Sequence, residues 1–162
     1  MNTERADLLE SLRRHRGFLL HTAGDLTDAQ AASRPTASQL CVGGIIKHVT
    51  SVERGWAAFA VGGADAMAAV PQDWATGFQM TAGETLAGLI AAYDAVAAET
   101  DKLVENCPDL DQAHPLPVAP WFEPGKSWSV RRVLLHLIAE TSQHAGHADI
   151  LRETIDGQKT MG

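Results

Sequence analysis

Residues 127–153 read SWSVRRVLLHLIAETSQHAGHADILRE, and this stretch decides the fold. Its apolar residues recur at spacings of three and four, which predicts one long helix with a single buried stripe. We expect the helix to begin at Ser127 or Ser129, to end near Ile155, and to have Gly157 as its C-cap. The stripe contains Val130, Leu134, Leu137, Thr141, His144, Ala148, Leu151 and Ile155.

Three further helical segments precede this one in the chain. The same spacing of apolar residues predicts helices at about 3–21, 38–59 and 81–103. Ser38 is the expected N-cap of the second helix, which Gly62-Gly63 would break, and Thr81 with Glu84 matches a capping box for the third.

The links between these segments differ in character. Residues 26–35 read as a connection with at most one turn of helix, and residues 62–80 look irregular. The link from 105 to 126 contains five prolines, and it could hold a short strand or two around Leu116 to Val118. A link of this length inside a compact domain often packs over a functional site.

Length and composition fit one all-α domain. The 162 residues are enough to bury a hydrophobic core, and 45% apolar with 20% charged residues is the balance of a globular protein. Helix, helix, helix, long crossover and helix is the order of a four-helix bundle. We therefore expect residues 1–162 to form a single four-helix-bundle domain with the long crossover before its last helix.

Charge and cysteine usage exclude several classes of partner. The net charge of −7 opposes binding to phosphate backbones, and the arginines form no basic stripe, so we expect no nucleic-acid partner. Charge or glycine interrupts the apolar stretches well short of a membrane span, and no signal peptide is visible. Cys41 and Cys107 lack CxxC spacing, which indicates reduced thiols in a cytoplasmic protein.

The last helix carries an unusual ladder of polar residues. His136, Glu140 and His144 follow at intervals of four, so each lies about 40° around the helix and about 6 Å along it from the next. Two adjacent rungs can share one metal ion, whereas the outer two lie about 12 Å apart. His144 falls within the apolar stripe and Glu140 at its edge, where both cost free energy unless they are satisfied.

The second helix contains a matching interruption. In SQLCVGGIIKHVTSVERGW (residues 38–56), His48 follows Ile45 and precedes Val52 and Trp56 at spacings of three and four, so we expect it to point inward. With Glu140 and His144 it would form a site of two nitrogens and one oxygen. Three protein ligands leave open positions, which is typical of a catalytic metal site.

Each of these residues also has a plainer interpretation. An inward histidine is often a hydrogen-bonded core residue, so the three side chains could form a metal-free polar network. His136 more plausibly packs or caps a neighbouring network. His147 is a candidate catalytic base or partner of a ligand, or it makes a hydrogen bond at a helix interface.

Three other features of the sequence have both a structural and a functional interpretation. Glu53 could orient His48 from one turn away, or could pair with a lysine or arginine. Cys41 lies about 10.5 Å along the helix from His48, too far to bind the same ion, and fits a core thiol. The four tryptophans could wall a pocket or pack in the core; they are Trp56, Trp74, Trp121 and Trp128.

Two segments together resemble the DinB/YfiT-like superfamily of proposed bacterial metalloenzymes. The first is KHVTSVERGW (47–56), an apolar helix with a ligand histidine followed by Glu and Trp, and the second is ETSQHAG (140–146), a ligand followed by His-x-Gly. Many members have histidine where this chain has Glu140. The branch that includes mycothiol-dependent maleylpyruvate isomerase has glutamate, and this resemblance implies that His48, Glu140 and His144 bind the metal.

The resemblance also implies a function. Members of that branch use a low-molecular-weight thiol, which binds at the metal as thiolate and attacks an electrophile. The chain extends only a few residues past the last helix, so we expect no counterpart of the isomerase's C-terminal domain and no isomerisation of maleylpyruvate. We expect a homodimer by the same resemblance.

The sequence thus predicts an enzyme that depends on a divalent metal and acts on a small molecule, either transferring a low-molecular-weight thiol or hydrolysing its substrate. Zinc is the expected ion, and nickel, manganese and iron also suit two imidazoles with a carboxylate. One alternative is a dimeric metal-binding or stress-response module without turnover. The other is the metal-free network.

Overall fold

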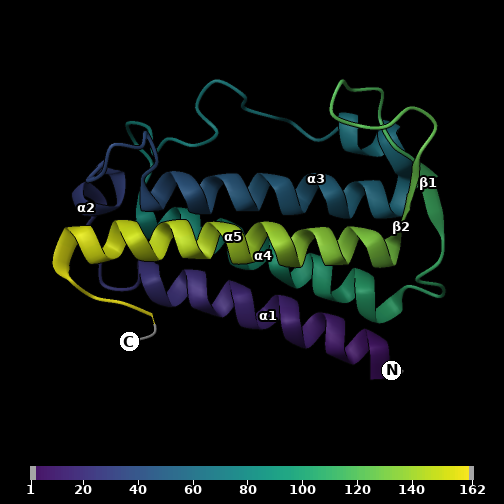
Figure 1. Cartoon of the computed structure of the whole chain (residues 1–162), viewed down its shortest axis with the longest axis horizontal. Coiled ribbons are helices and arrows are strands. Elements are labelled where there is room, and N and C mark those ends of the chain that lie inside the picture. The colour runs from purple at the N-terminus through teal and green to yellow at the C-terminus, as the bar shows by residue number, and fades with distance from the viewer. Residues whose placement is uncertain (1–2, 161–162) are drawn as a thin grey trace.

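Four long helices make up most of the computed structural model, which describes residues 3–160. In Figure 1, α3 and α5 run side by side, with the two short strands at one end of the bundle and α2 at the other. The all-α bundle with a long crossover before its last helix, predicted from the sequence, is confirmed. The elements are α1 (Thr3–Ala23), α2 (Asp28–Ala32), α3 (Val42–Ala68), α4 (Leu86–Asn106), β1 (Ala113–Pro115), β2 (Ser127–Ser129) and α5 (Val130–Asp156).

The apolar core is divided into two clusters. One contains Ile46 and Val49 of α3 with Ala145 of α5, and the other contains Trp56 of α3 with Leu137 of α5. Buried polar residues occupy the level between the clusters on three helices: Arg16, Glu53 and Thr141. Within the described residues, no helix is both long enough and apolar enough to cross a membrane.

The predicted limits of α5 agree with the structure. The hydroxyl of Ser129 accepts a hydrogen bond from the Arg132 amide at 3.1 Å and caps the helix. At the other end Gly157 adopts the left-handed conformation, with φ of 79°, that glycine tolerates without a Cβ clash.

The predicted starts of α3 and α4 were wrong. Ser38 accepts a local bond from the Leu40 amide, and α3 begins after Cys41, whose sulfur accepts from the Gly44 amide at 3.3 Å. The pairing of Thr81 with Glu84 does form, but it closes a turn, and α4 begins after its N-cap Thr85. In both cases a polar side chain satisfies a turn a few residues before the helix, which spacing alone does not distinguish from a cap.

The glycine pair at 62–63 bends α3 rather than ending it. Gly63 has φ of 72° and ψ of −158°, and the helix resumes over residues 64–68. That segment is rich in alanine, the strongest helix former, so helix is restored after the kink. A Cβ at Gly63 would lie 3.2 Å from the His114 ring, so the bend also lets β1 pack closely.

The strands lie to either side of the predicted place. β1 pairs antiparallel with β2, with His114 opposite Trp128, whereas residues 116–118 belong to neither strand. Leu116 still donates its amide to the Lys126 carbonyl at 2.9 Å.

Candidate metal centre

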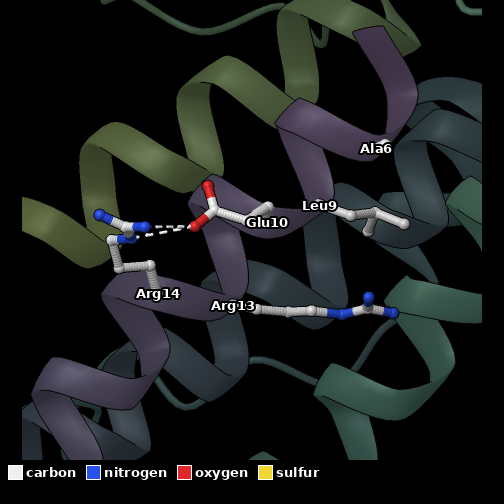
Figure 2. A pocket seen from close by; sticks show the side chains of 5 residues that line it. All are labelled: Ala6, Leu9, Glu10, Arg13 and Arg14. Carbon is white, nitrogen blue, oxygen red and sulfur yellow. Dashed lines mark hydrogen bonds and ion pairs between the residues drawn. The ribbon is translucent and has the colours of Figure 1, made fainter. Parts of the chain in front are cut away.

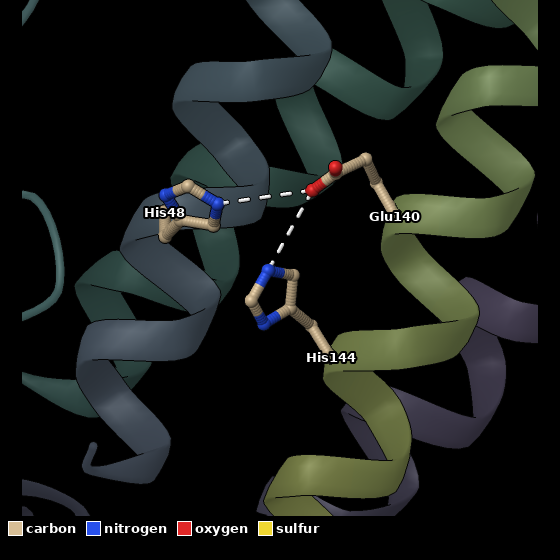
Figure 3. A group of neighbouring side chains, drawn as sticks. All are labelled: His48, Glu140 and His144. Atoms are coloured by element: carbon tan, nitrogen blue, oxygen red, sulfur yellow. Dashed lines mark ion pairs between the residues drawn. The ribbon is translucent and has the colours of Figure 1, made fainter. Parts of the chain in front are cut away.

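Helices α3 and α5 bring His48, Glu140 and His144 together. Nε2 of His48 lies 3.9 Å from Oε2 of Glu140, and Nε2 of His144 lies 3.6 Å from the same oxygen. One ligand atom from each residue lies within 4.8 Å of the other two. Figure 3 shows both imidazoles turned toward the carboxylate, that of His48 from α3 and that of His144 from α5, the helix that also carries Glu140.

These spacings are close to those around a shared cation. A hydrogen bond from an imidazole to a carboxylate would measure about 2.7–3.2 Å, and both contacts are longer. Atoms held about 2.0–2.2 Å from one tetrahedral zinc ion lie roughly 3.3–3.6 Å apart, so the His144 contact fits and the His48 contact is a few tenths of an ångström long. The group can therefore hold a metal ion.

Glu140 is held in its charged form. The neighbouring imidazoles of His144 and His48 keep the pKa of its carboxyl well below the usual value, and burial, which raises that pKa, is the smaller effect. A carboxylate that stays ionised and two imidazoles are the donors that zinc, nickel and iron accept.

The site lies partly exposed at the surface of the bundle. The side chains of His48, Glu140 and His144 are 22%, 28% and 11% exposed. We expected His48 to point inward, and it lies at the seam between the two helices, partly covered. Ligand side chains in such a position can be reached from solvent.

His136 lies on the other side of Glu140. Its Nε2 is 4.0 Å from Oε1 of Glu140, whereas His48 and His144 face Oε2. The edges of Trp56 and Trp128 contact its ring, and this burial lowers the pKa of His136 despite the opposing charge of Glu140. His136 thus packs against aromatic residues and is outside the group of three ligand atoms.

A residue that the sequence analysis did not single out covers His48. Phe78, in the segment 69–85 between α3 and α4, stacks on the His48 ring with centroids 3.8 Å apart and planes 19° apart. It also lies 5.7 Å from the His144 ring. Figure 1 shows this segment running back along α3 on the outside of the bundle.

Contacts with α3 hold this segment in place. The ammonium group of Lys47 lies 3.0 Å from a Glu84 oxygen and donates to the Thr76 hydroxyl and the Gln79 carbonyl. At Gly44 the segment is so close that a Cβ would lie 2.0 Å from the Phe78 carbonyl oxygen. Glycine inside a helix indicates such an approach, and Gly43-Gly44 was the signal available in the sequence.

We expect Gly44→Ala to destabilise the protein by about 1–3 kcal/mol, because the added methyl group must displace the backbone at Phe78. Chemical denaturation measures the change. Gly146→Ala is the matched control, since a Cβ there meets nothing within 4 Å and alanine favours helix by about 1 kcal/mol. Equal stability of the two variants would show that the segment does not pack against Gly44.

The remaining candidate residues have assigned places. Glu53 does not reach His48; it forms a buried ion pair with Arg16, which was the alternative left open. Cys41 is a buried thiol that caps α3. Trp56 is buried and stacks on Trp128, whereas the other two tryptophans, Trp74 and Trp121, are 84% and 72% exposed.

His147 contacts one of the candidate ligands. Its Nδ1 lies 3.3 Å from Nδ1 of His144, the ring nitrogen opposite the one that faces Glu140.

A hollow elsewhere on the surface contains none of the candidate site residues. Figure 2 shows it on α1, lined by Ala6, Leu9, Glu10, Arg13 and Arg14.

Comparison with known families identifies the chain. A family model described as mycothiol-S-transferase matches residues 7–157, which include all five helices in whole or in large part and the three clustered side chains. The chain belongs to the mycothiol-S-transferase family. The resemblance to the DinB/YfiT-like superfamily is thereby confirmed, and membership suggests a thiol S-transferase-like, metal-associated role.

A solved structure supports the fold of this mycothiol-S-transferase family member. The crystal structure of a conserved protein from Enterococcus faecalis aligns with 98% of this chain and 99% of its own, with a TM-score of 0.70. At 18% identity the likeness concerns the fold alone. The comparison with curated proteins gives no match.

Proposed function

We propose that this protein is a metal-dependent S-transferase that joins a low-molecular-weight thiol, mycothiol in the first instance, to a small electrophile. Two observations support the proposal. The ligand atoms of His48, Glu140 and His144 lie within 4.8 Å of one another, and the chain belongs to the mycothiol-S-transferase family. The convergence of ligand atoms carries the proposal, because it provides the place where a thiol would be activated.

The three side chains would hold the ion by two imidazole nitrogens and one carboxylate oxygen. A divalent cation bound there supplies Lewis acidity, which lowers the pKa of a thiol or a water molecule beside it. Three protein ligands leave positions for an external molecule. The negative charge kept on Glu140 balances half of the ion's charge and leaves a net positive site that favours a thiolate.

The proposed transfer makes one carbon–sulfur bond next to apolar side chains. The thiol gives its proton to water, its sulfur forms a bond to an electrophilic carbon, and any leaving group departs with its electron pair. Phe78 over His48 and the half-buried Trp128 ring beside His136 offer partly exposed apolar surfaces near the site. Such surfaces suit the apolar part of an electrophile and exclude water from one side of the reacting sulfur.

A thiol-conjugation assay tests the proposal. Zinc-loaded protein is mixed with mycothiol and chlorodinitrobenzene, and the conjugate is followed by its absorbance. We expect a rate above the uncatalysed one, and a loss of at least about 100-fold in His48→Ala, because that variant removes one of three ligands. His21→Ala, which replaces an exposed histidine of α1, is the matched control and should keep the full rate.

The outcomes separate the alternatives. Metal-dependent turnover that needs no thiol would indicate a hydrolase. Stoichiometric zinc binding without any turnover would support the non-catalytic module and contradict the S-transferase. Glutathione or cysteine replacing mycothiol at equal rate would contradict the specific choice of thiol.

Several finer features belong to the same proposal. Zinc is the proposed ion, with nickel, manganese and iron as the competitors that the same donors accept. A homodimer is proposed from the family, and the exposed apolar side chains Leu135 and Ile150 on α5 offer surface that a second copy would cover. A cytoplasmic location is proposed from the two free cysteines. The extent of the domain, residues 1–162, stays a prediction.

A further inference from the structure

We propose that His147 is a positioning residue that fixes the tautomer of His144, so that Nε2 of His144 is free to bind the ion. The proposal rests on the metal site described above. It concerns a residue outside the three ligands, and it assigns to His147 a role in metal affinity rather than in bond making.

The two rings are arranged for a single hydrogen bond. Nδ1 of His147 lies 3.3 Å from Nδ1 of His144, and the rings meet edge to face with centroids 5.3 Å apart. Both residues belong to α5, three positions apart, so the helix itself sets this geometry. Nε2 of His144 points the other way, toward Glu140 at 3.6 Å.

Proton placement on the rings follows from this arrangement. A neutral imidazole has one N–H, and a nitrogen that binds a cation has none. If Nε2 of His144 is the ligand, its proton must be on Nδ1, which then donates to Nδ1 of His147. His147 accepts there and has its own proton on Nε2, so one pattern of two protons satisfies the pair.

Because His144 is buried, a hydrogen-bond acceptor for its Nδ1–H stabilises the site. His144 is buried, so an Nδ1–H without an acceptor would cost the free energy of an unsatisfied buried donor. With His147 as acceptor, the Nδ1–H that His144 must have when its Nε2 binds the ion is satisfied, and the ring is kept from rotating. Partners of this kind typically change metal affinity by about 10–100-fold.

Zinc affinity in three proteins tests the proposal. Wild type, His147→Leu and His147→Asn are titrated against a chromophoric zinc chelator. Leucine fills similar space without an acceptor, whereas the side-chain oxygen of asparagine can take the place of Nδ1. We expect the zinc affinity of His147→Leu to be about 10–100-fold below that of wild type, and that of His147→Asn to be within about threefold of wild type.

Nitrogen-15 NMR of the zinc-loaded wild type provides a second readout, which a packing role would not affect. The proton of His144 should be on Nδ1 and that of His147 on Nε2. Thermal unfolding of the metal-free variants reports any loss of packing separately.

The outcomes are distinct from those of the proposed function. If the His147→Leu protein binds zinc as tightly as wild type, or the His147→Asn protein binds it as weakly as His147→Leu, the role of His147 is overturned while the metal site stands. A proton on Nδ1 of His147 in the zinc-loaded protein would also overturn it, because that nitrogen could not then accept from His144. Failure of wild type to bind zinc would instead refute the proposed function, and the role of His147 with it.

Discussion

Zinc affinity is expected to fall by more than about 100-fold in His144→Ala, which is beyond the loss that an outer partner alone causes. The imidazole of His144 is the most buried of the three candidate ligands and faces the same carboxylate oxygen as His48. Without it only His48 and Glu140 remain, and two ligands hold zinc weakly. Elemental analysis after dialysis measures the bound metal.

The comparison needs two further variants. Glu140→Ala should lose metal to a similar extent, because it removes the charge that both imidazoles face. His21→Ala, on the exposed surface of α1, should retain as much metal as wild type. Equal metal in wild type, His144→Ala and Glu140→Ala would remove this group from consideration as a metal site.

The second large effect concerns stability. Glu53→Ala is expected to destabilise the protein by about 3–5 kcal/mol, because it leaves the guanidinium of Arg16 buried without its main partner. Arg16 donates to the two oxygens of Glu53 at 2.5 and 3.1 Å, and the two side chains are only 6% and 2% exposed. Burial opposes the charge on Arg16, but Glu53 and Asp101 more than offset it, so its pKa is raised.

An exposed ion pair on α1, the helix that carries Arg16, provides the control. Glu10 and Arg14 pair at 2.6 Å on α1, with 60% and 63% of their side chains exposed. Glu10→Ala should cost less than about 1 kcal/mol, since water and salt screen such pairs. Urea denaturation measures both variants. A similar small cost for Glu53→Ala would show that the buried pair contributes little to the fold.

The buried pair lies at the level of the candidate metal site. Glu53 of α3 lies between the two apolar clusters of the core, one turn beyond His48, and Thr141 of α5 lies at the same level next to Glu140. Helices α1 and α3 are thereby tied together near His48, the candidate ligand that α3 supplies. A structural role for Glu53 thus helps to fix where His48 lies.

The periodicity of the sequence was sufficient to predict the bundle and the meeting of His48, Glu140 and His144. The apolar stripe of α5 placed His144 in the seam and Glu140 at its edge, and the same spacing on α3 brought His48 to them. Such inferences succeed because side-chain direction follows from position along a regular helix. Whether these three side chains bind a metal stays a prediction.

Features that depend on distant contacts were not predictable in this way. The stacking of Phe78 on His48 depends on how the segment 69–85 folds back over α3, and Gly44 alone pointed to such an approach. The pairing of Glu53 with Arg16 joins residues 37 positions apart in the chain, so spacing left both of its interpretations open. The late starts of α3 and α4 depend on which of several polar side chains caps, a balance of about 1 kcal/mol.

The most direct test of the account is anomalous diffraction at the zinc edge from crystals of the zinc-loaded protein. We predict one peak between α3 and α5, about 2.0–2.2 Å from Nε2 of His48, an oxygen of Glu140 and Nε2 of His144. A peak elsewhere on the molecule, or none at that position at full zinc occupancy, would contradict it.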